Sequence, residues 1–133
     1  MTYTESNKTE FVKARNNLSN DKAVFVTPYT ESEYEDMKAT CYLSENKKSG
    51  YAIKPDGDLI SVFSLEAGNG MFIVASAIKN GATKLDCIGK ELVRFYNKFG
   101  FREYDRWTWN DEYAPAGWDY EQNGRPDIVL MKR

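Results

Sequence analysis

The stretch of sequence that decides the fold is Leu92-Val93-Arg94-Phe95-Tyr96-Asn97-Lys98-Phe99-Gly100-Phe101. Its apolar residues recur at helical spacing, and Gly100 stands where a helix commonly ends. The residues that follow, 102–109, alternate in the manner of a strand. The stretch therefore predicts an amphipathic helix over residues 90–99 that leads directly into a strand. Within this helix, Tyr96 can bury its ring and present its hydroxyl to a cleft.

Length and composition indicate one globular domain over residues 1–133, with 41% hydrophobic and 29% charged residues. No apolar run approaches the roughly 18 residues needed to cross a bilayer. The first residues also lack a positive and then hydrophobic signal-like region. We therefore expect a cytoplasmic protein without a membrane partner.

The charge pattern and the missing histidines exclude several classes of function. The net charge is −2, and no basic cluster exceeds Lys47-Lys48, so no nucleic-acid partner is expected. The absence of histidine excludes Ser-His-Asp and Cys-His nucleophiles and removes the usual nitrogen ligand of zinc, and we expect no metal. Proton transfer would have to use carboxylates, tyrosine, lysine, cysteine or water. Cys41 and Cys87 lie in strand-like segments and are expected to be buried and reduced.

The first half of the chain predicts a helix, a strand, a second helix and a three-stranded meander. Residues 8–18 form a short helix in this interpretation, and residues 22–27 form a strand that stops at a proline. Thr30 and Glu33 have the spacing of a capping box, which opens a helix through about Met37. The meander is expected at residues 40–43, 51–53 and 59–63.

The second half predicts alternating helices and strands that end in a long loop. Residues 71–78 are apolar nearly all round, which is typical of a buried helix. A brief strand over residues 84–88 then precedes the helix quoted first. Residues 110–124 have no clear period and are expected to form a loop, and residues 127–131 a last strand.

This order of elements from residue 22, together with Tyr96 four residues before Gly100-Phe101, resembles the GNAT superfamily of N-acetyltransferases. The resemblance implies an α/β fold with a central mixed, mostly antiparallel twisted sheet flanked by helices, here with an extra N-terminal helix. The run from Asp111 to Trp118, followed by Gly124-Arg125-Pro126-Asp127, looks like that of small phage or bacterial acetyltransferase-like proteins.

The resemblance also implies acyl transfer from acetyl-coenzyme A to a primary amine of a small molecule or a protein. Tyr96 would be the general acid that protonates the leaving thiolate. The acyl donor would be held by a strand and loop in which leucine replaces the family's usual Gln or Arg: Phe63, Ser64, Leu65, Gly68, Asn69 and Gly70.

Two carboxylates are candidates for the general base that deprotonates the amine. Glu66 follows the strand that leads into the glycine loop, where this fold can place a base, and we predict it as the catalytic carboxylate. Asp86 lies inside an apolar strand and is interpreted instead as a hydrogen-bonded carboxylate that holds a loop or caps the helix near Gly89. An ordered water could replace both.

The C-terminal third gathers all three tryptophans among acidic residues, which favours a cationic acceptor. The predicted acceptor-binding residues are Trp107, Trp109, Trp118 and Asp119. The alternative is that a long loop buries its own aromatics to stay ordered. A second alternative concerns function: a catalytically silent member of the fold that binds another protein through these aromatics. The sequence leaves open whether the chain forms a homodimer.

Overall fold

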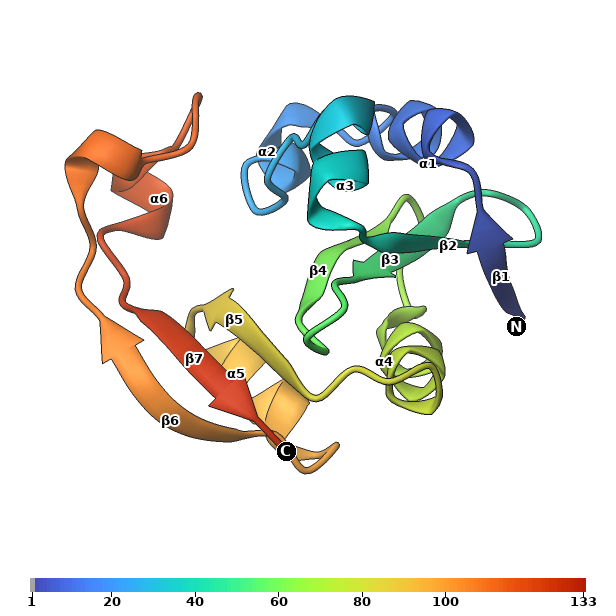
Figure 1. Cartoon of the computed structure of the whole chain (residues 1–133). Coiled ribbons are helices and arrows are strands. Elements are labelled where there is room, and N and C mark those ends of the chain that lie inside the picture. The colour runs from blue at the N-terminus through green and yellow to red at the C-terminus, as the bar shows by residue number, and fades with distance from the viewer. Residues whose placement is uncertain (1) are drawn as a thin grey trace.

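In the computed structural model, which describes residues 2–133, seven strands form two sheets that meet edge to edge (Figure 1). The first sheet is antiparallel, with the order β1 (Tyr3–Ser6), β2 (Thr40–Ser44), β3 (Ser49–Ile53) and β4 (Leu59–Ser64). The second is also antiparallel, with the order β5 (Lys84–Ile88), β7 (Ile128–Lys132) and β6 (Arg102–Trp107). The parallel bridge between Asp58 and Lys84 connects the two.

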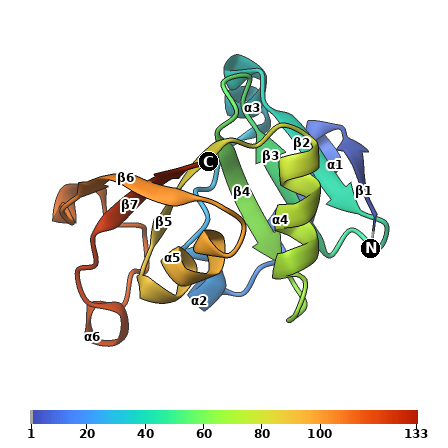
Figure 2. The same ribbon diagram turned by 90° about the horizontal axis from the view of Figure 1, so that it is seen from below.

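Helices cover both faces of the first sheet but only one face of the second. The helices α4 (Gly70–Lys79) and α5 (Lys90–Asn97) lie on the same side, as Figure 2 shows. The opposite side carries α1 (Lys8–Arg15), α2 (Asn20–Ala23) and α3 (Glu31–Met37). Between β6 and β7 the chain forms a 3₁₀ turn, η1 (Asp111–Tyr113), and α6 (Tyr120–Asn123). None of the helices within the described residues is long and apolar enough to cross a membrane.

A β-bulge in β4 sends its side chains to two separate cores. Leu59 packs in the core beneath α4 and α5, whereas Phe63 packs in the core beneath α1 and α3. Residues four apart on a regular strand would share a face. The extra residue lies at Ser61, which has a φ of 56°, and the register with β3 shifts at this point. The bulge therefore reverses the face on which β4 presents its side chains.

The predicted strand over residues 22–27 is wrong. Residues 20–23 form α2, and the following N–H groups of Phe25 and Val26 donate to Lys22 and Ala23 in successive turns. The β-branched residues of this segment lack a partner strand, and without pairing a β-propensity forms no strand. The strand that fills the place in the sheet is β1, which pairs with β2.

The N-terminal helix is therefore not an extra element before the sheet. It follows β1 and ends at Arg15, three residues before the predicted end. The other predicted helices and strands are confirmed with small changes of boundary. Among them, Thr30 and Glu33 form the complete capping box at the start of α3.

The helix α4 is confirmed, but it is not buried all round. Ile73, Val74 and Ala77 face the core, while Met71 and Phe72 in the first turn are 67% and 51% exposed. A helix that is apolar on every side does not itself indicate which face packs against the sheet. The packing of the sheet leaves the first turn of α4 at the surface.

Both cysteines are buried and free, as the sequence predicts. Burial raises the pKa of Cys41 and of Cys87 to about 11, so both thiols are protonated at neutral pH. We expect no reaction with iodoacetamide at pH 7.5 in the folded protein and modification of both thiols in guanidinium, measured by intact mass. Labelling of either thiol at the rate of free cysteine in the folded state would contradict this expectation.

Candidate active site

The strands β4 and β5 run parallel but separate along most of their length. The Asp58–Lys84 bridge holds them together where they begin, and Thr83 N donates to Gly57 O at 2.9 Å. Beyond this point no hydrogen bond joins the two strands within residues 2–133. Parted strands leave the backbone groups of both inner edges available to another molecule. This separation of the two strands, which we call the β4–β5 parting, is open at the C-terminal ends of the strands, near Ser64 and Ile88.

The loop from β4 to α4 presents unpaired backbone N–H groups at the open end of this parting. Asn69, the N-cap residue of α4, makes no side-chain cap hydrogen bond. Among the described residues, none of the backbone N–H groups of residues 67–72 donates a hydrogen bond to the protein. A helix N-terminus with free N–H groups carries partial positive charge and binds anions such as phosphate. The predicted cofactor residues Gly68, Asn69 and Gly70 all lie in this segment.

The hydroxyl of Ser64 organises this loop, because it donates to Glu66 O at 2.5 Å and accepts from Glu66 N at 3.2 Å. Asn69 Nδ2 also donates to it at 3.3 Å. The two glycines have different roles. Gly68 has a φ of +88° and open space around it, whereas a Cβ at Gly70 would lie 3.1 Å from Cζ of Phe95 on α5. Gly70 therefore allows α4 and α5 to approach.

Other predicted residues of this segment already have partners within the protein. The backbone N–H of Leu65 donates to Lys48 O at 2.7 Å, so this group is not available to a ligand. The side chain of Phe63 is buried in the core beneath α1 and α3. Glu66 is exposed and accepts a hydrogen bond from Asn46 Nδ2 at 3.0 Å. Its role as the base stays a prediction.

Tyr96 lies on the face of α5 that packs against β5, between the rings of Phe95 and Phe101. The residue is only 7% exposed, and desolvation raises its pKa, with smaller contributions from Cys87 and Asp86. Its hydroxyl makes no hydrogen bond to another described residue. Every fully buried side-chain N or O among the described residues has a hydrogen-bond partner, so an atom without one is not fully buried. The hydroxyl oxygen therefore reaches solvent. It is protonated at neutral pH and free to donate.

Asp86 does not have the structural role predicted for it. The N-cap of α5 is Gly89, which has no side-chain cap, and the carboxylate of Asp86 has no hydrogen-bond or ion-pair partner in another described residue. Its side chain is exposed on the face of β5 away from α5. Even so, desolvation raises its pKa, and the positive charge of Lys54 only partly opposes this effect.

The aromatic loop stabilises itself with three of the four residues predicted to bind the acceptor. Trp109 and Trp118 stack with ring centroids 4.6 Å apart, and Trp118 Nε1 donates to Gly124 O at 3.0 Å. Asp119 caps α6 by accepting from Gln122 N. The alternative interpretation of the loop is thus favoured for these three. Trp107, on β6, takes no part in these contacts and is 55% exposed.

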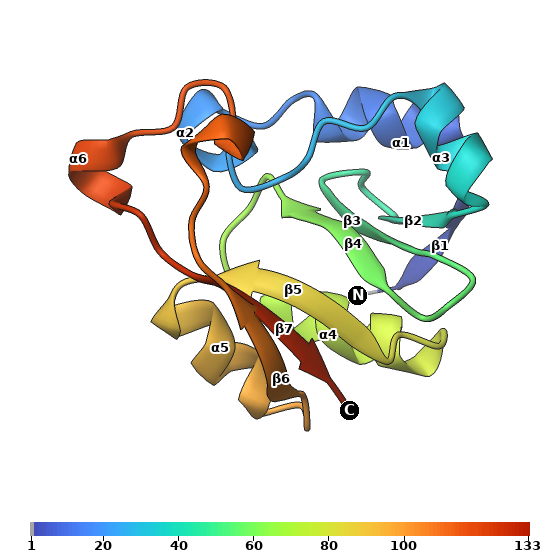
Figure 3. The ribbon, with the colours of Figure 1, turned by 60° about the vertical axis from the view of Figure 1, so that its left-hand side comes forward.

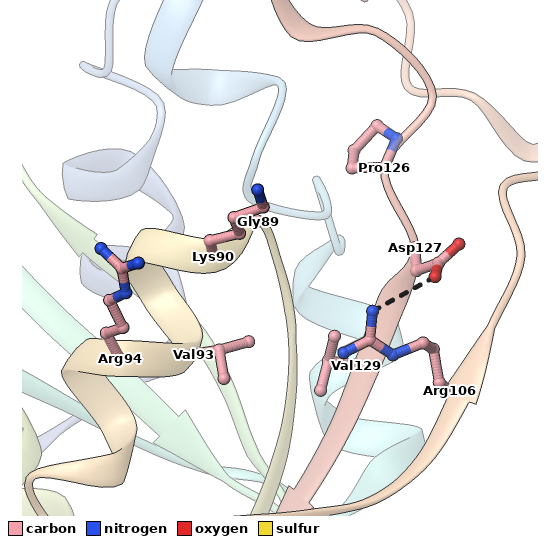
Figure 4. A pocket seen from close by; sticks show the side chains of 8 residues that line it. All are labelled: Gly89, Lys90, Val93, Arg94, Arg106, Pro126, Asp127 and Val129. Carbon is pink, nitrogen blue, oxygen red and sulfur yellow. Dashed lines mark hydrogen bonds and ion pairs between the residues drawn. The ribbon is translucent and has the colours of Figure 1, made fainter.

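A cavity of about 320 Å³ lies between α5 and the strands β6 and β7 (Figure 4). It contains none of the predicted site residues. Val93 and Val129 form apolar walls, and Arg106 Nη1 lies 3.3 Å from Asp127 Oδ2 across one side. The cavity lies on the far side of β5 from the β4–β5 parting, because β7 and β6 follow β5 in the sheet.

Sequence reasoning missed a buried polar network that supports the β4 bulge. Arg15 Nη1 donates to Tyr34 Oη at 2.9 Å and to Tyr29 O at 2.6 Å. The Tyr34 hydroxyl also lies 2.6 Å from Ser61 Oγ, in a hydrogen bond in which either group can be the donor. The three side chains come from α1, α3 and β4, and no local pattern connects residues so distant in sequence.

The chain is similar in fold to several solved structures of acetyltransferases. A GNAT-family acetyltransferase from Streptococcus pneumoniae is 17% identical, with a TM-score of 0.63 over 99% of this chain and 98% of that one. A GNAT-family acetyltransferase from Elizabethkingia anophelis with acetyl-CoA bound is 19% identical, with a TM-score of 0.55 over 98% and 95%. An acetyltransferase from Bacillus subtilis in complex with CoA is 14% identical, with a TM-score of 0.52 over 97% and 95%.

No protein-family model matches the chain, and no curated protein matches it. The chain has the GNAT acetyltransferase fold, as its sequence predicts. Within residues 2–133, no group of three or more acidic or cysteine side chains could hold a metal ion.

Proposed function

We propose that the protein is an acyl-coenzyme A dependent N-acyltransferase. The observation that carries this proposal is the run of free N–H groups at residues 67–72 beside the parted strands β4 and β5. The parting would receive the extended pantetheine arm along exposed strand edges, and the N-terminus of α4 would bind the diphosphate. Two of the solved structures that share the fold contain acetyl-CoA or CoA, which supports the same donor.

In the proposed reaction, an amine attacks the thioester directly, and Tyr96 donates its phenolic proton to the departing thiolate. The raised pKa of Tyr96 keeps this proton in place until the thiolate forms. Strand edges position the acyl group, and positioning with leaving-group protonation suffices for direct transfer. This route requires neither a covalent enzyme intermediate nor a metal.

Calorimetry with acetyl-CoA tests the proposal, and saturable binding at sub-millimolar concentration is expected. Gly68→Asn and Gly68→Asp form a matched pair, because both carry the strain of a positive φ in open space and only one adds a charge. The aspartate lies where the diphosphate would bind. We expect it to weaken binding about fivefold more than asparagine, as a charge repulsion of about 1 kcal/mol predicts.

The absence of saturable binding would instead favour the silent, protein-binding alternative. That alternative is supported by exposed aromatic side chains, of which Tyr113 is 81% and Tyr104 47% exposed. Equal affinities of the two Gly68 variants would move the diphosphate away from the N-terminus of α4.

A further inference from the structure

The second sheet has one face that no helix covers. Leu85 and Cys87 of β5 are buried beneath α5, so the intervening Asp86 and the flanking Ile88 point to the opposite face. Register places Asp86 beside Leu130, Ile88 beside Ile128, and Ile128 beside Trp107. These residues of three strands therefore share one surface, which we call the open face: Asp86, Ile88, Trp107, Ile128 and Leu130.

The open face presents three apolar side chains beside Asp86, and register places a second carboxylate, Asp105, next to Leu130 at the β6 edge of this face. Ile88, Ile128 and Leu130 are half-buried, and none belongs to the core beneath α1 and α3. Figure 3 shows α5 on one side of β5 and β7, with α2 and the loop carrying α6 on the other. These two segments touch, because the rings of Phe25 and Trp118 lie 5.3 Å apart. They form a rim beside the open face.

Asp86 occupies the position on the open face nearest to the place where β4 and β5 separate. The strands are joined at Lys84, and Asp86 is the next residue of β5 that points to this face. Tyr96 approaches the same part of β5 from the other face, since both Cys87 and Asp86 act on it electrostatically. A group held at the inner edge of β5 would thus have a phenol on one side and a carboxylate on the other.

We propose that Asp86 is the general base and that the open face binds the acyl acceptor, a small primary amine with an apolar or aromatic body. This inference rests on the proposed function. The unpartnered carboxylate complements an ammonium group, while the isoleucines and Leu130 cover an apolar body and Trp107 offers a ring to it. Desolvation also makes Asp86 a stronger base than an ordinary aspartate.

The proposed step moves the acyl group from sulfur to nitrogen, with proton transfers at Asp86 and Tyr96. Asp86 takes a proton from the ammonium group, and the freed nitrogen lone pair forms the N–C bond to the thioester carbon. The C–S bond breaks, its electron pair leaves with sulfur, and the thiolate takes the proton of Tyr96. The second proton on the nitrogen leaves as the C–S bond breaks and passes through solvent to the Tyr96 phenolate, while Asp86 releases its own proton to solvent. The products are a neutral amide and the free thiol.

The test compares two acceptors of equal shape, 2-phenylethylamine and O-benzylhydroxylamine, in which an oxygen replaces one methylene. The first is protonated at neutral pH and needs a base, whereas the second is already largely unprotonated. We expect Asp86→Asn to slow acetylation of 2-phenylethylamine by about 10²-fold and that of O-benzylhydroxylamine by less than about threefold. Asp36→Asn, which removes an exposed carboxylate on α3 and leaves the second sheet untouched, is the matched control and should leave both rates unchanged.

Three results would overturn the inference. Equal losses with both acceptors would show that Asp86 supports structure, and no loss with either would exclude it as the base. A wild-type protein that binds acetyl-CoA but acetylates neither amine would exclude this class of acceptor. Failure to bind acetyl-CoA at all is a different outcome, because it removes the proposed function itself.

Discussion

Replacement of Tyr96 by phenylalanine is expected to lower turnover by about 10²-fold or more, with little change in affinity for acetyl-CoA. The hydroxyl has no partner within the described residues, so its removal costs no internal hydrogen bond. The ring stays between Phe95 and Phe101 and still packs against β5. Only the proton for the leaving thiolate is lost. Steady-state kinetics measures the change in kcat, and calorimetry measures the affinity.

The design separates chemistry from folding. The melting temperature of Tyr96→Phe should match that of the wild type, because no contact of the ring is changed. Tyr113→Phe removes a hydroxyl from an exposed loop tyrosine and serves as the matched control with full turnover expected. Unchanged turnover in Tyr96→Phe would exclude the phenol as the acid, and a parallel loss of affinity would assign it to donor binding instead.

Local patterns in the sequence were sufficient for those elements whose signals lie within a few residues. The capping box at Thr30 and the glycine after Phe99 define where α3 begins and where α5 must end. The prediction of a strand at residues 22–27 was wrong, because strand pairing decides which segment of high β-propensity becomes a strand. Tyr3–Ser6 is short and polar, but it meets the free edge of β2 and forms the strand there.

The site was predictable where it depends on backbone, and less so where it depends on side chains from distant segments. The glycines of the loop and Tyr96 on its helix follow from spacing alone. The direction of the Asp86 side chain could not be predicted, because it depends on which face of β5 is covered by α5. The sequence did not distinguish the three tryptophans from one another. In the structure, the rings of Trp109 and Trp118 pack against each other, whereas Trp107 is exposed.

The largest effect on stability is expected from Tyr34→Ala, which should lower the free energy of unfolding by about 3–5 kcal/mol. Tyr34 is fully buried, and its ring packs edge-on against Phe11 at 5.5 Å. Truncation leaves a cavity in the core beneath α1 and α3 and takes the partner from both Arg15 and Ser61. Chemical denaturation followed by tryptophan fluorescence measures the change.

A double-mutant cycle resolves the part of this effect that belongs to the β4 bulge. Tyr34→Phe keeps the ring and should cost about 1–3 kcal/mol, because Ser61 Oγ loses its Tyr34 partner and Arg15 keeps only Tyr29 O and Asn16 as acceptors. Ser61→Gly removes the hydroxyl but also relieves the left-handed backbone strain of about 1–2 kcal/mol. In the Tyr34→Phe background, the Ser61 hydroxyl no longer has its Tyr34 partner. Ser61→Gly then only relieves the backbone strain, so it should stabilise the protein. Additive single effects would show that Tyr34 and Ser61 are not coupled, and that the bulge is held by the strand pairing alone.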